Sequence, residues 1–126
     1  MDKVVHFEIP VDNLGRAKEF YQDLFGWKIT EVPGMPYWIV HTVETDEQQM
    51  PKESGAINGG FFKKEDDEKI SPVIVINVPD IDEYIMKIEQ AGGKIILPKN
   101  QVGEFGLYAR FEDTEGNVVG IWQDLK

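Results

Sequence analysis

Cysteine is absent from this 126-residue sequence, and histidine is limited to His6 and His41. The missing cysteine excludes disulfide bonds, cysteine-ligated metals and thiol nucleophiles. Basic residues are also few, 13 against 23 acidic ones, for a net charge of −10. This balance argues against partners such as nucleic acid or an anionic membrane, because both favour a basic protein surface.

Long hydrophobic runs are missing as well. The longest aliphatic run covers residues 73–76, far short of the roughly 20 residues that span a membrane. Asp2, Lys3, His6 and Glu8 stand where a signal peptide would have an apolar core. We therefore expect a cytoplasmic protein.

The composition is that of a globular protein, with 41% hydrophobic and 29% charged residues. A chain of this length is expected to fold as a single domain, residues 1–126. Within it we expect a first module at about 1–63, a charged linker at about 64–71 and a second module at about 72–126.

The first module is predicted to run strand, helix and three strands. Residues 4–9 alternate apolar and polar side chains, as a half-buried strand does. Asp12 or Asn13 can cap a helix with apolar residues at helical spacing up to Phe25, and Gly26 ends it. Short strands are expected at 27–31, 37–43 and 56–62.

The second module repeats this order. We predict a strand at 72–78, a helix from 81 to 91, and strands at 94–97, 108–112 and 117–123. The glycines at 103 and 106 indicate an irregular loop between two of these strands. The halves align with a shift of 67 residues at their start, which pairs Leu14 with Ile81 and Gly26 with Gly93, and of 61 near their end, which pairs Gly59 with Gly120 and Phe61 with Trp122. The third strands align with Tyr37 on Tyr108.

Several short motifs accompany this repeat. They are His6-Phe-Glu-Ile-Pro-Val-Asp-Asn-Leu14, Ala17-Lys-Glu-Phe-Tyr21, Leu24-Phe-Gly-Trp27, Val78-Pro-Asp-Ile81, Ala91-Gly-Gly93 and Phe111-Glu-Asp-Thr-Glu-Gly-Asn117. With them the sequence resembles the vicinal oxygen chelate superfamily, which contains glyoxalase I, bleomycin-resistance proteins and extradiol dioxygenases. The resemblance implies an α+β fold in which two tandem βαβββ modules form a curved mixed sheet around a cleft, with the helices on the outer face.

Strand alternation then sorts side chains between the two faces of the expected sheet. Val5, Phe7, Ile9, Ile74, Ile76 and Val78 are expected beneath the helices. The cleft face is expected to hold His6, Glu8, Gly59, Phe61, Val73, Val75, Asn77, Tyr108, Arg110, Gly120 and Trp122.

The metal site of the superfamily is the part of the resemblance that this sequence matches least. The resemblance implies ligands on the first and last strand of each module, here His6, Val73, Gly59 and Gly120. Among these only His6 can coordinate an ion, whereas a catalytic site needs about three protein ligands. A one-residue misalignment would bring in Asn58, and Glu8 or His41 could be recruited. We predict no metal ligands and no cofactor, and a divalent metal stays the alternative.

The remaining cleft residues favour binding of a small, partly apolar molecule without a catalytic metal. Tyr37, Phe61, Tyr108, Arg110 and Trp122 are the predicted ligand contacts, and His6 with Glu8 is a candidate acid–base pair. The alternative is a metal-dependent lyase or isomerase of the glyoxalase I type. A third possibility is an interaction module without small-molecule function.

A homodimer is the expected assembly. The resemblance implies it, and Phe61 and Trp122 would leave an apolar patch on an open cleft, which a second copy could cover. Because each chain carries a charge of −10, association should tighten as salt screens the repulsion.

Overall fold

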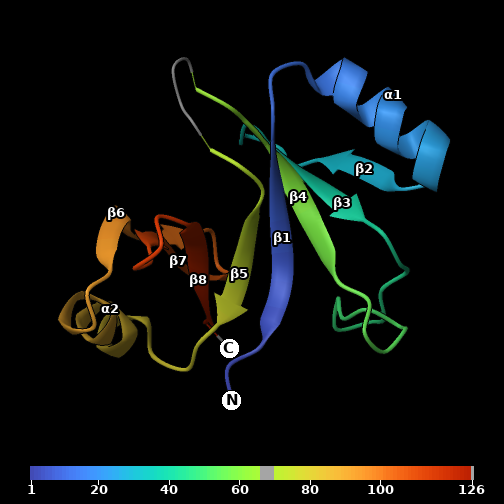
Figure 1. Cartoon of the computed structure of the whole chain (residues 1–126). Helices are drawn as coiled ribbons and strands as arrows, with labels where there is room; N and C mark the ends of the chain where they lie inside the picture. Colours follow the sequence, from blue (N-terminus) through green and yellow to red (C-terminus); the bar gives the residue numbers. More distant parts are fainter. Residues whose placement is uncertain (66–69, 126) are drawn as a thin grey trace. The chain divides into compact units, whose positions relative to one another are not determined.

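The computed structural model describes residues 1–65 and 70–125, so half of the predicted linker at 64–71, residues 66–69, lies outside the described residues. Within this part the chain forms two helices and eight strands, with parallel and antiparallel pairings mixed, which confirms the predicted α+β class (Figure 1). The elements are β1 (Val4–Val11), α1 (Leu14–Phe25), β2 (Lys28–Glu31), β3 (Tyr37–His41), β4 (Asn58–Lys63), β5 (Val73–Asn77), α2 (Ile81–Gln90), β6 (Lys94–Val102), β7 (Gly106–Glu112) and β8 (Val118–Asp124).

These elements form two compact units. The N-terminal unit is His6–Pro72, and the C-terminal unit combines Met1–Val5 with Val73–Lys126. Strand order is β2-β3-β4-β1 in the former and β5-β8-β7-β6 in the latter. The predicted order of strand, helix and three strands is confirmed in both halves of the sequence. The predicted cleft depends on how the units are arranged, and it stays a prediction.

Helix α1 begins and ends at the residues that the sequence indicates. The Asn13 side chain accepts a hydrogen bond from the Arg16 backbone N–H at 3.0 Å, which satisfies one free amide of the first turn. Gly26 ends the helix in the left-handed region with φ 72°, and its N–H donates to the carbonyl of Gln22. Glycine adopts this conformation without steric cost, so it suits the position.

The core of the N-terminal unit lies between its strands and α1. Its buried residues are Val11, Val40 and Phe61. The partly buried side chains packed on them are Phe7, Ile9, Leu14, Ala17, Tyr21, Trp27, Ile29 and Trp38. Phe7 and Ile9 therefore face the helix, as strand alternation predicts.

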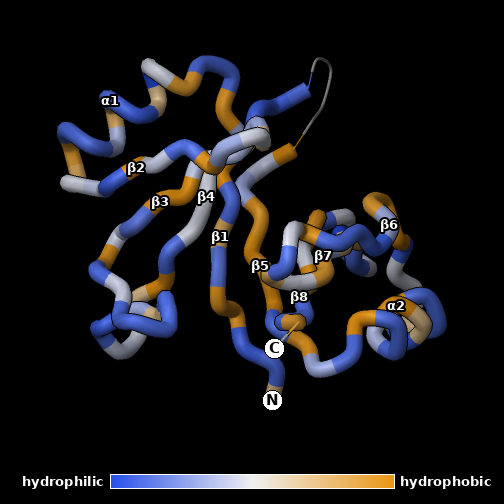
Figure 2. Tube along the Cα trace, turned by 180° about the vertical axis from the view of Figure 1, so that it is seen from behind, coloured by the Kyte–Doolittle hydropathy of each residue, from blue (hydrophilic) through white to orange (hydrophobic). Residues whose placement is uncertain are grey.

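A second core fills the C-terminal unit, on the side where α2 packs. Its buried residues are Val78, Ile81, Ala109 and Ile121. Figure 2 shows that β5, the strand that ends just before Val78, is mainly hydrophobic. The prediction that Ile74 packs beneath the helix is wrong, because Ile74 is 47% exposed. Helix α2 packs mainly against β6 and β7, so it does not cover the start of β5.

Strand β6 is longer than predicted. It continues through 98–102 and pairs with β7 up to Val102 and Gly106, so that only residues 103–105 form the connection. The predicted irregular loop is thus the turn of a hairpin. Because β6 is at the edge of its unit's strand order, the proline at position 98 is tolerated within it.

Candidate functional site

The polar face of β1 carries the two residues predicted as an acid–base pair. His6 and Glu8 alternate with Phe7 and Ile9 along the strand, so they face away from the α1 core. Their parallel partners on β4 are Asn58 and Gly60. Glu8 is buried, with only 6% of its surface exposed.

Tyr37 reaches this polar face from β3. Because the strand order is β3-β4-β1, its side chain must cross β4 to meet His6. It does so over Gly60, and the Tyr37 hydroxyl lies 2.7 Å from His6 Nε2. A Cβ atom at position 60 would collide with the Tyr37 hydroxyl and ring. The glycine therefore provides the space through which the hydrogen bond forms.

Burial controls the protonation state of His6. Removal from water lowers the pKa of His6 below 6.5, and the negative charge of Glu8 acts in the opposite direction more weakly. Burial therefore favours the neutral form of the ring. A neutral imidazole has one N–H donor and one acceptor nitrogen, so His6 can bond to Tyr37 through Nε2 and present the other nitrogen elsewhere.

Phe61 and Gly59 do not lie on this face, and the prediction that they do is wrong. Phe61 has 0% of its surface exposed and packs in the α1 core, with its ring centroid 5.5 Å from that of Tyr21. Gly59 pairs with Phe7. The face of β4 that His6 shares carries Asn58, Gly60 and Phe62. Phe61 thus cannot contribute the exposed patch from which the homodimer was argued, and the dimer stays a prediction.

The C-terminal unit repeats the tyrosine–glycine arrangement. The hydroxyl of Tyr108 on β7 would lie 2.8 Å from a Cβ placed on Gly120 of β8. Arg110 Nε donates to this hydroxyl at 2.7 Å. The Trp122 ring centroid is 6.4 Å from that of Tyr108. The structure therefore brings together the predicted ligand contacts Tyr108, Arg110 and Trp122 within one unit, and His6, Glu8 and Tyr37 within the other.

In the structure the last strands of the two halves align with a shift of 60 residues, and not with the shift of 61 predicted from the sequence. Gly60 and Gly120 both lie under a tyrosine, and Phe62 and Trp122 are the residues paired with Tyr37 and Tyr108. Sequence reasoning missed Gly60 as a site residue. The signal that could have identified it is the glycine pair 59–60, whose second member also aligns with Gly120.

The residues present do not fit a metal site of the type that the superfamily implies. Asn58 Oδ1 accepts hydrogen bonds from the backbone N–H groups of Thr42, at 2.8 Å, and Val43, at 3.1 Å, so it is engaged elsewhere. Tyr37 occupies the space above Gly60. Across the part of the chain that the structure describes, no three His, Asp or Glu side chains are grouped closely enough to hold an ion.

The chain matches one protein family over nearly its whole length. The profile of the Glyoxalase/Bleomycin resistance protein/Dioxygenase superfamily covers residues 3–121. A glyoxylase-like domain-containing protein of Didymella fabae is 31% identical over 118 residues, covering 90% of this chain and 88% of that protein. CFP32 of Mycobacterium tuberculosis, provisionally named a glyoxylase, is 28% identical over 114 residues, 85% of this chain. This chain spans only 40% of the length of CFP32.

Solved structures agree on the fold. A methylmalonyl-CoA epimerase of Streptomyces coelicolor superposes with a TM-score of 0.68 at 16% identity, covering 98% of both chains. A hypothetical protein of Bacillus halodurans gives a TM-score of 0.66 at 15% identity, covering 99% of this chain and 96% of that one. Among the described residues, neither helix has the length and apolar character needed to cross a bilayer. Sequence profile and fold agree that this chain belongs to the Glyoxalase/Bleomycin resistance protein/Dioxygenase superfamily.

Proposed function

We propose that this protein binds a small, partly apolar molecule whose polar group meets the His6–Tyr37 pair, and that it does so without a catalytic metal. The observation that supports this best is the 2.7 Å hydrogen bond between the two side chains across Gly60. Binding sites for small molecules combine apolar walls with a few fixed polar groups. Ile39 is on the same face of these strands, is partly exposed and supplies apolar surface.

The ligand chemistry that suits this pair is an uncharged carbonyl or hydroxyl group. Because burial favours the neutral ring, the His6 nitrogen that is not bonded to Tyr37 offers one donor or one acceptor but no charge for an anion. Tyr108, Arg110 and Trp122 are the second proposed set of ligand contacts, in the C-terminal unit. The Arg110 guanidinium group lies 5.6 Å from the Tyr108 ring centroid. A guanidinium group can bind a carboxylate or a phosphate through two parallel hydrogen bonds.

A thermal-shift screen followed by calorimetry tests the proposal. We would screen uncharged aromatic ketones and alcohols in the presence of a chelator, then repeat the titration with His6→Gln and Tyr37→Phe. Loss of one hydrogen bond should weaken binding by roughly five- to tenfold, since such a bond contributes about 1 kcal/mol. His41→Gln makes the same change at the other histidine of the chain and is the matched control for His6→Gln. Equal binding by all variants, or no stabilising compound at all, would contradict the proposal.

The alternative is a metal-dependent lyase or isomerase of the glyoxalase I type. The names of the similar proteins from M. tuberculosis and D. fabae favour it, whereas the residues around His6 do not. Purified protein would be assayed with methylglyoxal and glutathione, with nickel or zinc and again after chelation. Stoichiometric metal with chelator-sensitive turnover would overturn the metal-free proposal in favour of this enzyme.

A further inference from the structure

A hollow of about 360 Å³ lies in the C-terminal unit, on the side of its strands where α2 packs. Its floor and walls are apolar, formed by Ile76, Val78, Ile88, Phe111 and Ile121, and its rim includes Met1, Asp2 and Tyr84. The volume is at the lower end of the 300–1,000 Å³ that small-molecule pockets occupy. This site shares no residue with the His6–Tyr37 pair.

Helix placement explains why the hollow is there. Helix α2 packs mainly against β6 and β7, so β5 and the adjoining part of β8 are less covered. Val78 and Ile121 at the base are each 2% exposed, whereas Ile76 and Ile88 are half-buried. The result is an apolar surface open from one side.

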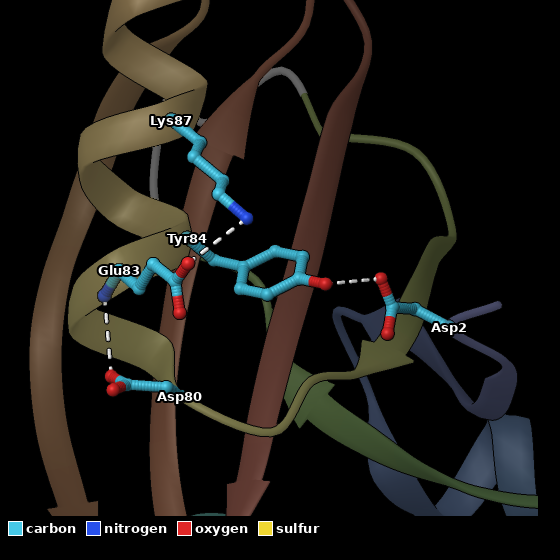
Figure 3. Close-up of polar contacts among 5 residues, drawn as sticks. All are labelled: Asp2, Asp80, Glu83, Tyr84 and Lys87. Carbon is cyan, nitrogen blue, oxygen red and sulfur yellow. Dashed lines mark hydrogen bonds and ion pairs between the residues drawn. The ribbon is translucent and has the colours of Figure 1, made fainter.

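The rim of this hollow carries a single carboxylate, that of Asp2. Its Oδ2 accepts a hydrogen bond of 2.5 Å from the Tyr84 hydroxyl (Figure 3). The carboxylate raises the pKa of Tyr84, so the hydroxyl stays protonated and continues to donate. Among residues 1–65 and 70–125, the Tyr84 hydroxyl is the one hydrogen-bond donor that contacts Asp2.

Charged residues of α2 act on Asp2 and Tyr84 as well. Lys87 interacts with Asp2 through its charge, but its Nζ lies 3.1 Å from Glu83, with which it forms an ion pair one helical turn apart. Asp80 caps the helix by accepting from the Glu83 backbone N–H at 3.2 Å. Figure 3 shows these side chains along α2, with Tyr84 reaching away from the helix to Asp2.

We propose that this hollow binds a small amphiphilic ammonium compound, with its apolar body on Ile76 and Ile121 and its cationic group at Asp2. The apolar lining supplies the free energy of burial, and the carboxylate selects the charge. The net charge of −10 on the chain also attracts cations, so it favours an ammonium compound over an anion as Asp2 does.

The corresponding hollow of the N-terminal unit provides an internal comparison. It has a volume of about 340 Å³ and lies between β1 and α1, with Ile9 and Val11 in the places of Ile76 and Val78. Its rim has Arg16, and its carboxylate Asp12 lies 3.8 Å from Lys64 Nζ. A cation should therefore be selected in the C-terminal hollow and not in this one.

Three probes of similar size distinguish charge from apolar contact. We would titrate the whole chain with 2-phenylethylammonium, 2-phenylethanol and 3-phenylpropionate, and follow backbone and methyl NMR signals. The cation should bind about two- to fivefold more tightly than the alcohol, as expected for an exposed ion pair, and the anion more weakly than both. The shifted signals should be those of Ile76, Ile88 and Ile121.

Variants separate this proposal from the function proposed for His6 and Tyr37. Asp2→Asn should remove the preference for the cation while the alcohol still binds. Tyr84→Phe keeps the wall and frees Asp2 Oδ2, so the preference should persist. Glu89→Gln, which makes the same charge change at an exposed site on α2, should leave the affinities read from the Ile76, Ile88 and Ile121 signals unchanged. Tyr37→Phe should leave the affinities read from these signals unchanged as well, even if it weakens binding of the alcohol at His6. Equal affinity for the three probes at the signals of the C-terminal hollow, or shifts from the ammonium probe centred on His6 or in the N-terminal hollow, would overturn the proposal.

Discussion

The Tyr37 hydroxyl and His6 Nε2 lie 2.7 Å apart although their strands are separated by a third strand, and the contact passes over Gly60. Backbones two strands apart in a sheet are roughly 9.5 Å from each other, because each spacing is about 4.8 Å. A tyrosine can span this distance only if the residue between has no side chain. The identity of one glycine thus determines whether the candidate site exists.

Gly60→Ala is expected to break this site and to destabilise the protein. The added methyl group would collide with Tyr37, so the ring must move at a cost of about 1–3 kcal/mol, typical of overpacking. Urea unfolding would measure the loss. Combining the change with Tyr37→Ala should cost less than the sum of the two single changes, because the two sites are in contact.

Gly15→Ala in α1 is the matched control for that experiment. A Cβ there would meet only Asn13 Oδ1 at 3.5 Å, an ordinary contact. The substitution should stabilise the helix by about 0.5–1 kcal/mol, since alanine loses less backbone entropy than glycine. Equal destabilisation at positions 15 and 60 would contradict the close approach described for Tyr37.

The stability of the protein should fall as pH drops below 6.5. His6 has a lowered pKa in the folded state because of burial, whereas in the unfolded chain it titrates near 6.5. Between these two pKa values the unfolded state binds the extra proton, so acidification favours unfolding. Above 6.5 both states are neutral and the effect vanishes.

Urea unfolding at pH 7.5 and 5.5 would measure this dependence. His6→Gln should show a smaller loss of stability between the two pH values than the unaltered protein does. An NMR titration of the His6 ring gives the independent readout. A midpoint at or above 6.5 would contradict the role assigned to burial.

Phe61→Ala should destabilise the protein by about 3–5 kcal/mol, the usual cost of removing a buried aromatic ring. The side chain is fully buried against α1, so the substitution leaves a cavity in the core. Phe20→Ala is the comparison, because Phe20 is 56% exposed and should cost no more than about 0.5 kcal/mol. Similar small losses of stability at both positions would contradict the burial of Phe61 in the α1 core.

Asp113→Ala should weaken the β7–β8 hairpin. The carboxylate accepts the backbone N–H groups of Glu115 and Asn117, each at 2.8 Å, and the Asn117 side chain at 3.2 Å. The bond from the Asn117 backbone contributes most to the lowered pKa of Asp113. Thermal unfolding should show a lower midpoint for Asp113→Ala than for Thr114→Ala. The contribution of Asp113 should be lost as pH falls through its lowered pKa.

Local signals in the sequence were sufficient for much of the fold. Asn13 begins α1 by capping it with its side chain, and Gly26 ends it in the left-handed region, as predicted. Alternation in β1 places His6 and Glu8 on one face. The repeat also aligned Tyr37 with Tyr108 correctly. These features depend on neighbours in the chain, which a sequence displays directly.

The face of β4 could not be determined in the same way. Gly59 and Gly60 are both buried, and so are Phe61 and Phe62, so the strand shows no alternation of apolar and polar residues. Its register depends on pairing with β1 and β3, which lie far away in sequence. The extension of β6 through residues 98–102 was missed for a related reason, since residues 98–101 are all exposed and show no alternation of buried apolar and exposed polar side chains.

The membership of residues 1–5 in the C-terminal unit has a consequence for the order of folding. Lys3 accepts a hydrogen bond from the Asn77 backbone N–H at 2.9 Å, a contact that closes a loop of more than seventy residues. Contacts so distant in sequence form late, because closing the loop costs entropy before the contact is gained. The N-terminal unit is one continuous stretch of sequence, so all of its residues are synthesised before β5. Residues 1–5, although synthesised before that whole unit, reach their native neighbours only after β5 has been made.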